Sequence, residues 1–174
     1  MLKNPIVAAI LCVIIVISST VISTHVRLDS WCEEISDGFT ASGGIADQLN
    51  TVSTAGSGII RIAQANGIDC PETQDLCESL RLSAYTDSPH SLFSMYQMLC
   101  GEIGDLTNSL RLKDLSAQDA ALLESLNAEL DAARSAISNS AYNNSVTFFL
   151  RKELGSFSAR FAKLCGVRLP EQFA

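Results

Sequence analysis

Histidine and basic residues are scarce in this sequence. Its 174 residues include two histidines, His25 and His90, which leaves little material for a metal site or a catalytic triad. Lys and Arg number 12 against 19 Asp and Glu, and the net charge is −7. Nucleic acids are bound by basic surfaces, so this balance argues against a nucleic-acid partner.

The motifs of catalytic and cofactor sites are also missing. The sequence has no G-x-S-x-G elbow, no Gly-rich loop ending in Lys-Ser or Lys-Thr, no H-E-x-x-H and no C-x-x-C-H. Gly56-Ser57-Gly58 lies inside a helical pattern rather than after a strand, so it does not predict a phosphate site. No alternating polar and apolar run predicts a β-strand. We therefore expect an all-α protein that is not an enzyme and has no cofactor or metal.

One long apolar run is present near the start of the sequence. The mean hydropathy of the chain is +0.22, and most of this excess comes from residues 5–26, which include no Asp, Glu, Lys or Arg. About 22 residues at roughly 1.5 Å each are enough to cross a hydrocarbon core of about 30 Å. Residues 1–27 therefore predict a single-pass membrane anchor at the N-terminal end.

A cleaved signal peptide is the alternative interpretation of this run. Lys3 would be its basic start, residues 6–17 its apolar region and residues 21–23 a small-residue cleavage site. The run is longer than a signal peptide needs, which favours the anchor. Lys3 and Arg27 lie on opposite sides of the run, so the basic-residue rule leaves the orientation open, with the bulk of the chain favoured outside.

The spacing of apolar residues after the anchor is that of a helix. From residue 28 to residue 63 an apolar or small residue recurs every third or fourth position, as in a helical bundle or a coiled coil. The pattern predicts a helix over residues 28–66, continuous with the anchor and ended by Gly67. Its glycines either lie under bulky neighbours or, as the alternative, break the helix near residues 43 and 44.

Turn and capping residues predict two more helices. Pro71 suits the first turn of a helix that extends to about Ala84. Ser88 and Pro89 are an N-cap and a first helical residue, and a regular apolar stripe follows them.

Ser116 and Asp119 resemble a capping box at the start of the last helix. No proline follows before Pro170, so we expect this helix to continue to an interruption at Gly155 and an end at Gly166. The predicted fold is an N-terminal transmembrane helix followed by an elongated antiparallel bundle of about four helices. Residues 28–167 form the bundle and residues 168–174 a C-terminal tail.

The cysteines do not predict a disulfide framework. One of them, Cys12, lies in the anchor, and an odd number remains: Cys32, Cys70, Cys77, Cys100 and Cys165. An odd number cannot be fully paired within one chain. We expect these residues to be small apolar side chains at helix interfaces.

Charge is segregated along the chain. Residues 29–131 contain 17 acidic and 4 basic residues, a net charge of −13, whereas residues 134–174 have a net charge of +4 and are rich in phenylalanine. Basic and aromatic residues at helical spacing suit a surface that lies on anionic lipid. The other interpretation, which we favour, is that this segment packs on the acidic body of its own bundle. The candidate lipid-contact residues are Arg151, Lys152, Phe157, Arg160, Phe161 and Lys163.

The end of the sequence contains four segments that match one known pattern: Ala141-Tyr142-Asn143-Asn144-Ser145-Val146, Ser156-Phe157, Ala162-Lys163-Leu164-Cys165-Gly166-Val167 and Pro170-Glu171-Gln172-Phe173. They resemble the closing pattern of the LemA family, whose members have one N-terminal membrane helix and a bundle of long antiparallel helices. Phe149-Leu150 replaces the second Tyr-Asn pair of that pattern, so the chain resembles a divergent member. The resemblance implies the family topology, no established enzymatic activity, and a packing and hydrogen-bonding role for Tyr142 and Asn143.

These observations predict a membrane-anchored helical bundle with a structural or protein-interaction role at the cell envelope. Its expected partners are membrane lipid, other membrane or envelope proteins, and further copies of itself. The alternative is a sensory or small-ligand-binding bundle, with the ligand entering between helices near the glycine-rich middle of the first predicted helix.

Overall fold

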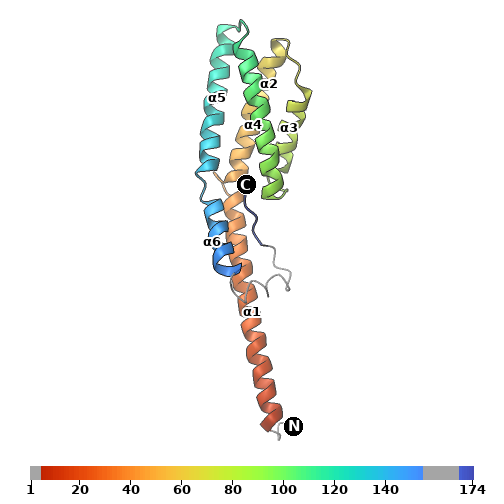
Figure 1. Cartoon of the computed structure of the whole chain (residues 1–174), viewed down its shortest axis with the longest axis vertical. Coiled ribbons are helices and arrows are strands. Elements are labelled where there is room, and N and C mark those ends of the chain that lie inside the picture. The colour runs from red at the N-terminus through yellow and green to blue at the C-terminus, as the bar shows by residue number, and fades with distance from the viewer. Residues whose placement is uncertain (1–4, 155–168) are drawn as a thin grey trace.

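The longest helix, α1 (Pro5–Thr40), begins in the apolar run and continues without interruption into the body of the protein (Figure 1). The computed structural model describes residues 5–154 and 169–174. Within them, α1 is followed by α2 (Ile45–Ala65), α3 (Pro71–Ser83), α4 (Pro89–Arg111), α5 (Ala117–Ser138) and α6 (Tyr142–Leu154). The part of the chain that the structure describes contains no strand, so the predicted all-α fold is confirmed.

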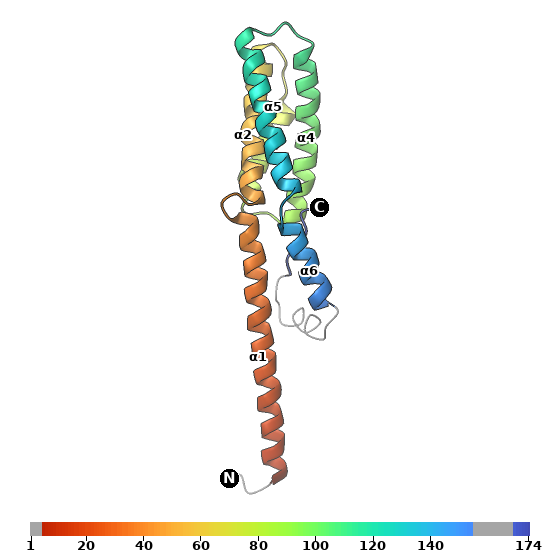
Figure 2. The ribbon, with the colours of Figure 1, turned by 90° about the vertical axis from the view of Figure 1, so that its left-hand side faces the viewer.

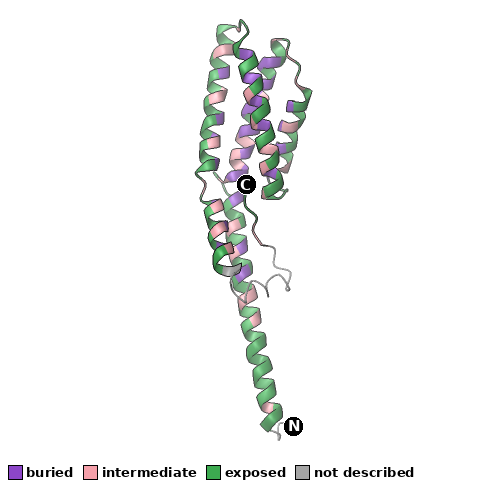
Figure 3. Ribbon diagram, viewed as in Figure 1, coloured by how far each residue is buried: buried purple, intermediate pink, exposed green. Residues whose placement is uncertain are grey.

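Helix α2 is the centre of the bundle. It packs against α3, α4 and α5, while α6 lies along the upper half of α1 (Figure 2). The lower half of α1 extends away from the bundle, and side chains such as Val16 and Ile22 are more than 60 % exposed (Figure 3). The structure is therefore an elongated four-helix bundle on a projecting apolar helix, as the sequence predicts.

A turn over residues 41–44 separates α1 from α2. Gly43 has a φ of +79°, and its N–H donates a hydrogen bond to Asp47 Oδ2 over 3.0 Å. A Cβ atom on Gly44 would lie 2.6 Å from the carbonyl oxygen of Phe39 and 2.8 Å from that of Ala41, so no larger residue fits there. The prediction of one helix over residues 28–66 is wrong, and the alternative break near residues 43 and 44 is confirmed.

The glycines within α2 allow neighbouring helices to pack closely. A Cβ atom on Gly56 would lie 2.6 Å from Ile103 Cδ1, and one on Gly58 would lie 2.8 Å from Leu126 Cδ1. These two positions let α4 and α5 approach the backbone of α2, as the sequence predicts. Nearby, the buried Ser53 hydroxyl donates a hydrogen bond to the Cys77 carbonyl over 2.7 Å, which ties α2 to α3.

The predicted helix ends are confirmed at several places. Ser88 Oγ accepts a hydrogen bond from the backbone N–H of Ser91, and Ser116 Oγ accepts one of 3.0 Å from that of Asp119. Gly67, after α2, has a φ of +74°.

The predicted unbroken last helix is wrong, because α5 ends at Ser138 and α6 begins at Tyr142. Asn139 Nδ2 donates to the Ser135 carbonyl over 2.9 Å, and Ser140 Oγ accepts from the Tyr142 N–H over 3.2 Å. These short polar side chains compete with the backbone for hydrogen bonds, so they end one helix and begin the next without glycine or proline. The break lets α6 pack on α1. The predicted interruption at Gly155 and end at Gly166 lie outside the described residues.

The turn over residues 41–44 gives a test of the fold. Gly44→Ala places a Cβ atom against rigid backbone oxygens, so we expect the free energy of unfolding to fall by about 1–3 kcal/mol. Gly38→Ala is the matched control, because nothing lies within 4 Å of the added atom. The control should raise the free energy of unfolding by up to about 1 kcal/mol through helix propensity. Denaturant unfolding of the full chain in detergent measures both, and equal effects of the two variants would contradict this account of the turn.

Candidate functional site

Side chains of α1, α4 and α6 meet the C-terminal residues 169–174 at the end of the bundle nearer the apolar helix. The aromatic ring of Phe173 is 3 % exposed and lies among four other rings. Its ring centroid is 5.1 Å from that of Phe93, 5.8 Å from Tyr96 and 6.0 Å from Phe39, and Phe39 is 5.1 Å from Tyr142. Tilted and edge-to-face pairs of this kind each contribute about 0.5–1.5 kcal/mol beyond the area that they bury. We call these five rings the Phe173 cluster.

Asn143 holds the backbone of Phe173 in place. Its Nδ2 donates to the Phe173 carbonyl oxygen over 2.8 Å, and its Oδ1 accepts from the Phe173 N–H over 2.8 Å. One side-chain amide thus satisfies both polar groups of a buried residue, in the manner of a neighbouring β-strand.

Two further hydrogen bonds fix the same tail segment. The hydroxyl of Tyr142 donates to the Glu171 carbonyl over 2.7 Å, and Gln172 Nε2 donates to Thr147 Oγ1 over 2.7 Å. Burial, with a smaller contribution from Glu171, raises the pKa of Tyr142 to about 12. The phenol therefore stays protonated at neutral pH and acts as a donor.

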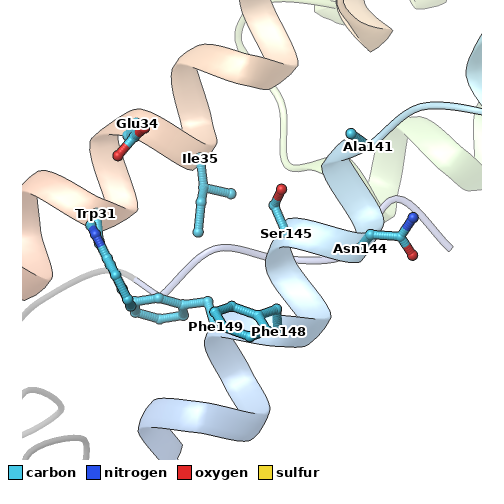
Figure 4. Close-up of a pocket in the computed structure, with 8 residues that line it drawn as sticks. All are labelled: Trp31, Glu34, Ile35, Ala141, Asn144, Ser145, Phe148 and Phe149. Carbon is cyan, nitrogen blue, oxygen red and sulfur yellow. The ribbon is translucent and has the colours of Figure 1, made fainter.

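A groove lies beside this cluster, between α1 and α6 (Figure 4). It has a volume of about 460 Å³ and is lined by Trp31, Glu34, Ile35, Ala141, Asn144, Ser145, Phe148 and Phe149. The Trp31 and Phe149 rings meet edge to face with centroids 6.0 Å apart, and Phe149 is buried against Leu28 and Cys32. Phe148, by contrast, is 61 % exposed.

Lys152 lies over two of the rings that line this groove. Its Nζ lies 5.1 Å from the centroid of the Trp31 ring and 5.3 Å from that of Phe148. An ammonium at this distance is attracted by the π-faces of both rings. Arg151, in the same last turn of α6, is exposed.

A second groove of about 480 Å³ adjoins the first. It lies at the turn after α1, where Gly38, Gly43 and Gly44 face Ser140 and Tyr142. The glycines deeper in α2, Gly56 and Gly58, are instead covered by side chains of α4 and α5.

Burial favours the protonated form of three described thiols, Cys32, Cys70 and Cys77. Burial raises the pKa of Cys77 to about 11, and burial also raises the pKa values of Cys32 and Cys70. Thiols of this kind are poor nucleophiles. Among the described residues, no group of three His, Cys, Asp or Glu side chains could hold a metal ion.

The residues singled out from the sequence fall into two groups. Tyr142 and Asn143 lie in the first turn of α6 and contact the tail, whereas Arg151 and Lys152 lie in its last turn. The remaining candidate lipid-contact residues, Phe157, Arg160, Phe161 and Lys163, lie outside the described residues. Sequence reasoning missed the partnership of Trp31 with α6, because nothing in the spacing shows that α6 turns onto α1.

The contact between Asn143 and Phe173 can be tested by substitution, with the neighbouring Asn144 as the control position. Asn143→Ala leaves the Phe173 N–H and carbonyl without partners, so we expect the free energy of unfolding to fall by about 1–3 kcal/mol. The exposed Asn144 is the matched position, and Asn144→Ala should change this free energy by less than about 0.5 kcal/mol. Hydrogen exchange followed by mass spectrometry should show lost protection of residues 169–174 in the first variant alone. Unchanged protection in Asn143→Ala would refute the role given to this side chain.

The raised pKa of Tyr142 predicts a loss of stability in alkali. The unfolded phenol ionises near its ordinary pKa of 10.0, whereas the folded one holds its proton to about pH 12. The contribution of Tyr142 to the free energy of unfolding is complete below pH 10 and is lost as the pH rises toward 12. Unfolding free energies measured over this window should fall less steeply in Tyr142→Phe than in the wild type. Parallel curves for the two proteins would contradict the prediction.

Comparisons of the chain with family models, with curated proteins and with solved structures gave no match. The function is therefore inferred from the residues and contacts described above.

Proposed function

We propose that the protein is a membrane-anchored helical bundle with a structural or protein-binding role at the cell envelope. The observation that carries this proposal is the continuity of α1. One half of this helix is apolar and exposed, and the other half is built into the body through Leu28, Cys32 and Phe39.

The apolar half of α1 supports the anchor. Of the described helices, one is long and apolar enough to cross a membrane, and its most apolar stretch has a mean hydropathy of 2.8 with none of its residues buried. Each large apolar side chain left in water forgoes about 1.5–3 kcal/mol of burial free energy. A bilayer provides that burial, whereas the bundle does not.

The cleaved-leader alternative fits α1 less well. Cleavage near residue 23 would cut a helix that continues without a break to Thr40. An anchor uses the whole helix, because one rigid element then holds the bundle at a fixed distance from the membrane.

The far end of the bundle supports a role in binding proteins. Leu112, in the turn between α4 and α5, is 90 % exposed at the tip away from the apolar helix. Residues 29–131, which contribute most of the bundle, have a net charge of −13. A projecting leucine among Arg111, Lys113 and Asp114, at the end of an acidic body, is suited to contact a second protein.

The resemblance to the LemA family is a further argument for this proposal. The segments that carry it are distant in the sequence, and two of them meet in the structure: Tyr142 and Asn143 contact residues 171–173. This contact supports the packing and hydrogen-bonding role that the resemblance implies for Tyr142 and Asn143.

A small-ligand-binding bundle is the second candidate. The groove at Gly38, Gly43 and Gly44 favours it, because this groove lies at the glycine-rich turn and offers both polar and apolar walls. The ligand would enter beside the turn rather than deeper along α2.

Photo-cross-linking in intact membranes tests the leading proposal. A photoreactive residue in place of Leu112 should capture a reproducible protein neighbour, identified by mass spectrometry, because this side chain projects from the tip. The same residue at Leu11, in the apolar half of α1, separately reports self-association through the anchor.

A sample kept in the dark is the control for both positions. A strictly monomeric protein with no reproducible neighbour from either position would contradict the proposal. If a small molecule then raised the melting temperature, the second candidate would take its place.

A further inference from the structure

Trp31 lies at the level of the lipid headgroups if α1 spans the membrane. The charge-free run ends at Val26, and Trp31 follows five residues later, which is about 7.5 Å farther along a helix. The headgroup layer on each side of the hydrocarbon core is about 5–7.5 Å thick. Lys152 lies over the Trp31 ring and Phe149 meets it edge to face, so the second half of α6 lies at the same level.

The groove between α1 and α6 is apolar at its membrane end and polar at the other. Trp31 precedes Glu34 along α1, and Phe148 follows Asn144 along α6, which runs antiparallel to α1. The three aromatic rings therefore gather toward the membrane, as Figure 4 shows, and Glu34, Asn144 and Ser145 lie beyond them. A phospholipid has the same order: acyl chains, phosphate, then a polar headgroup.

Two basic side chains lie in the last turn of α6, near the aromatic end of the groove, while the stretch of α1 around Trp31 carries Asp29, Glu33 and Glu34. Lys152 forms no ion pair with a described residue, and its ammonium lies over two rings at the groove. Arg151 adds a second exposed basic group in the same turn. Lysine and tryptophan are the residue types that favour the membrane interface, with an apolar body and a polar tip. Glu34, one turn beyond Trp31 along α1, is the one acidic side chain that lines the groove, and it is placed to accept hydrogen bonds from headgroup hydroxyls.

We propose that this groove binds an anionic phospholipid with a hydroxylated headgroup, taken from the membrane that holds α1. Lys152 and Arg151 contact the phosphate, and Trp31 and Phe148 cover the glycerol end of the acyl chains. The groove volume of about 460 Å³ is within the range of roughly 300–1,000 Å³ typical of small-molecule sites. The inference rests on the proposed membrane anchor. It adds to that proposal the class of lipid that the protein binds.

The chain contains its own reporter for this site, because Trp31 is its one tryptophan. Full-length protein is placed in vesicles of phosphatidylcholine and phosphatidylglycerol in which one of the two lipids is brominated near the glycerol. Bromine quenches tryptophan fluorescence at short range. At equal mole fractions, brominated phosphatidylglycerol should quench Trp31 more strongly than brominated phosphatidylcholine.

Lys152→Gln and Lys113→Gln are the matched variants. Both remove one positive charge, but Lys113 lies between α4 and α5 at the far end of the bundle. Lys152→Gln should lower the preference for phosphatidylglycerol about fivefold, the effect of one basic residue near an anionic surface. Lys113→Gln should leave the preference unchanged.

The outcomes separate this inference from the anchor on which it rests. Equal quenching by the two lipids, or equal effects of the two variants, would overturn the lipid site while leaving the anchor intact. Quenching by neither lipid would place Trp31 away from the bilayer, and the anchor and the lipid site would fail together.

Discussion

Burial of the Phe173 ring against Phe39 joins the apolar helix to the bundle, and the rest of the architecture depends on it. The buried side chains of α1 are Leu28, Cys32 and Phe39. Leu28 and Cys32 pack with Phe149 of α6, and the Phe39 ring contacts those of Tyr142 and Phe173. Asn143 prevents this burial from leaving polar groups unpaired, because its side chain hydrogen-bonds both the N–H and the carbonyl oxygen of Phe173. Without these contacts α1 would be attached mainly through the turn over residues 41–44 and the first residues of α2.

The helices of the bundle could be predicted from the sequence because their signals are local. Apolar stripes, Ser88 and Ser116 as caps, and Gly67 after α2 each depend on residues within a few positions. The break at residues 41–44 remained one of two alternatives, since the apolar spacing continues across it. The break before Tyr142 was missed for a related reason: an Asn-Ser pair ends α5 through side-chain hydrogen bonds that also occur on uninterrupted helices.

The contacts of the candidate site could not be predicted in the same way, because they join residues far apart in the chain. Asn143 meets Phe173 across 30 positions, and Trp31 meets Lys152 across more than a hundred. Tyr142 and Asn143 were singled out only through resemblance to a known pattern. The grooves depend on how α6 packs on α1, which follows from shape rather than from composition. The segregation of charge along the sequence singles out Arg151 and Lys152, which lie in the last turn of α6, at its end nearer the apolar half of α1. Their contact with lipid stays a prediction.

The pairing of Phe39 with Phe173 also fixes an order of events during synthesis. The apolar half of α1 emerges from the ribosome before the bundle, and α2, α3 and α4 can pack on one another as soon as they follow, because their contacts are close in sequence. The Phe173 cluster cannot close until residue 173 has been made, nearly 135 positions after Phe39. For most of its synthesis the chain is therefore an apolar helix and a nascent bundle joined by a short turn, and the rings of Phe39, Phe93 and Tyr96 lack the cover of Phe173. Chaperones that bind exposed aromatic surface have that interval in which to act, and the arrival of the tail ends it.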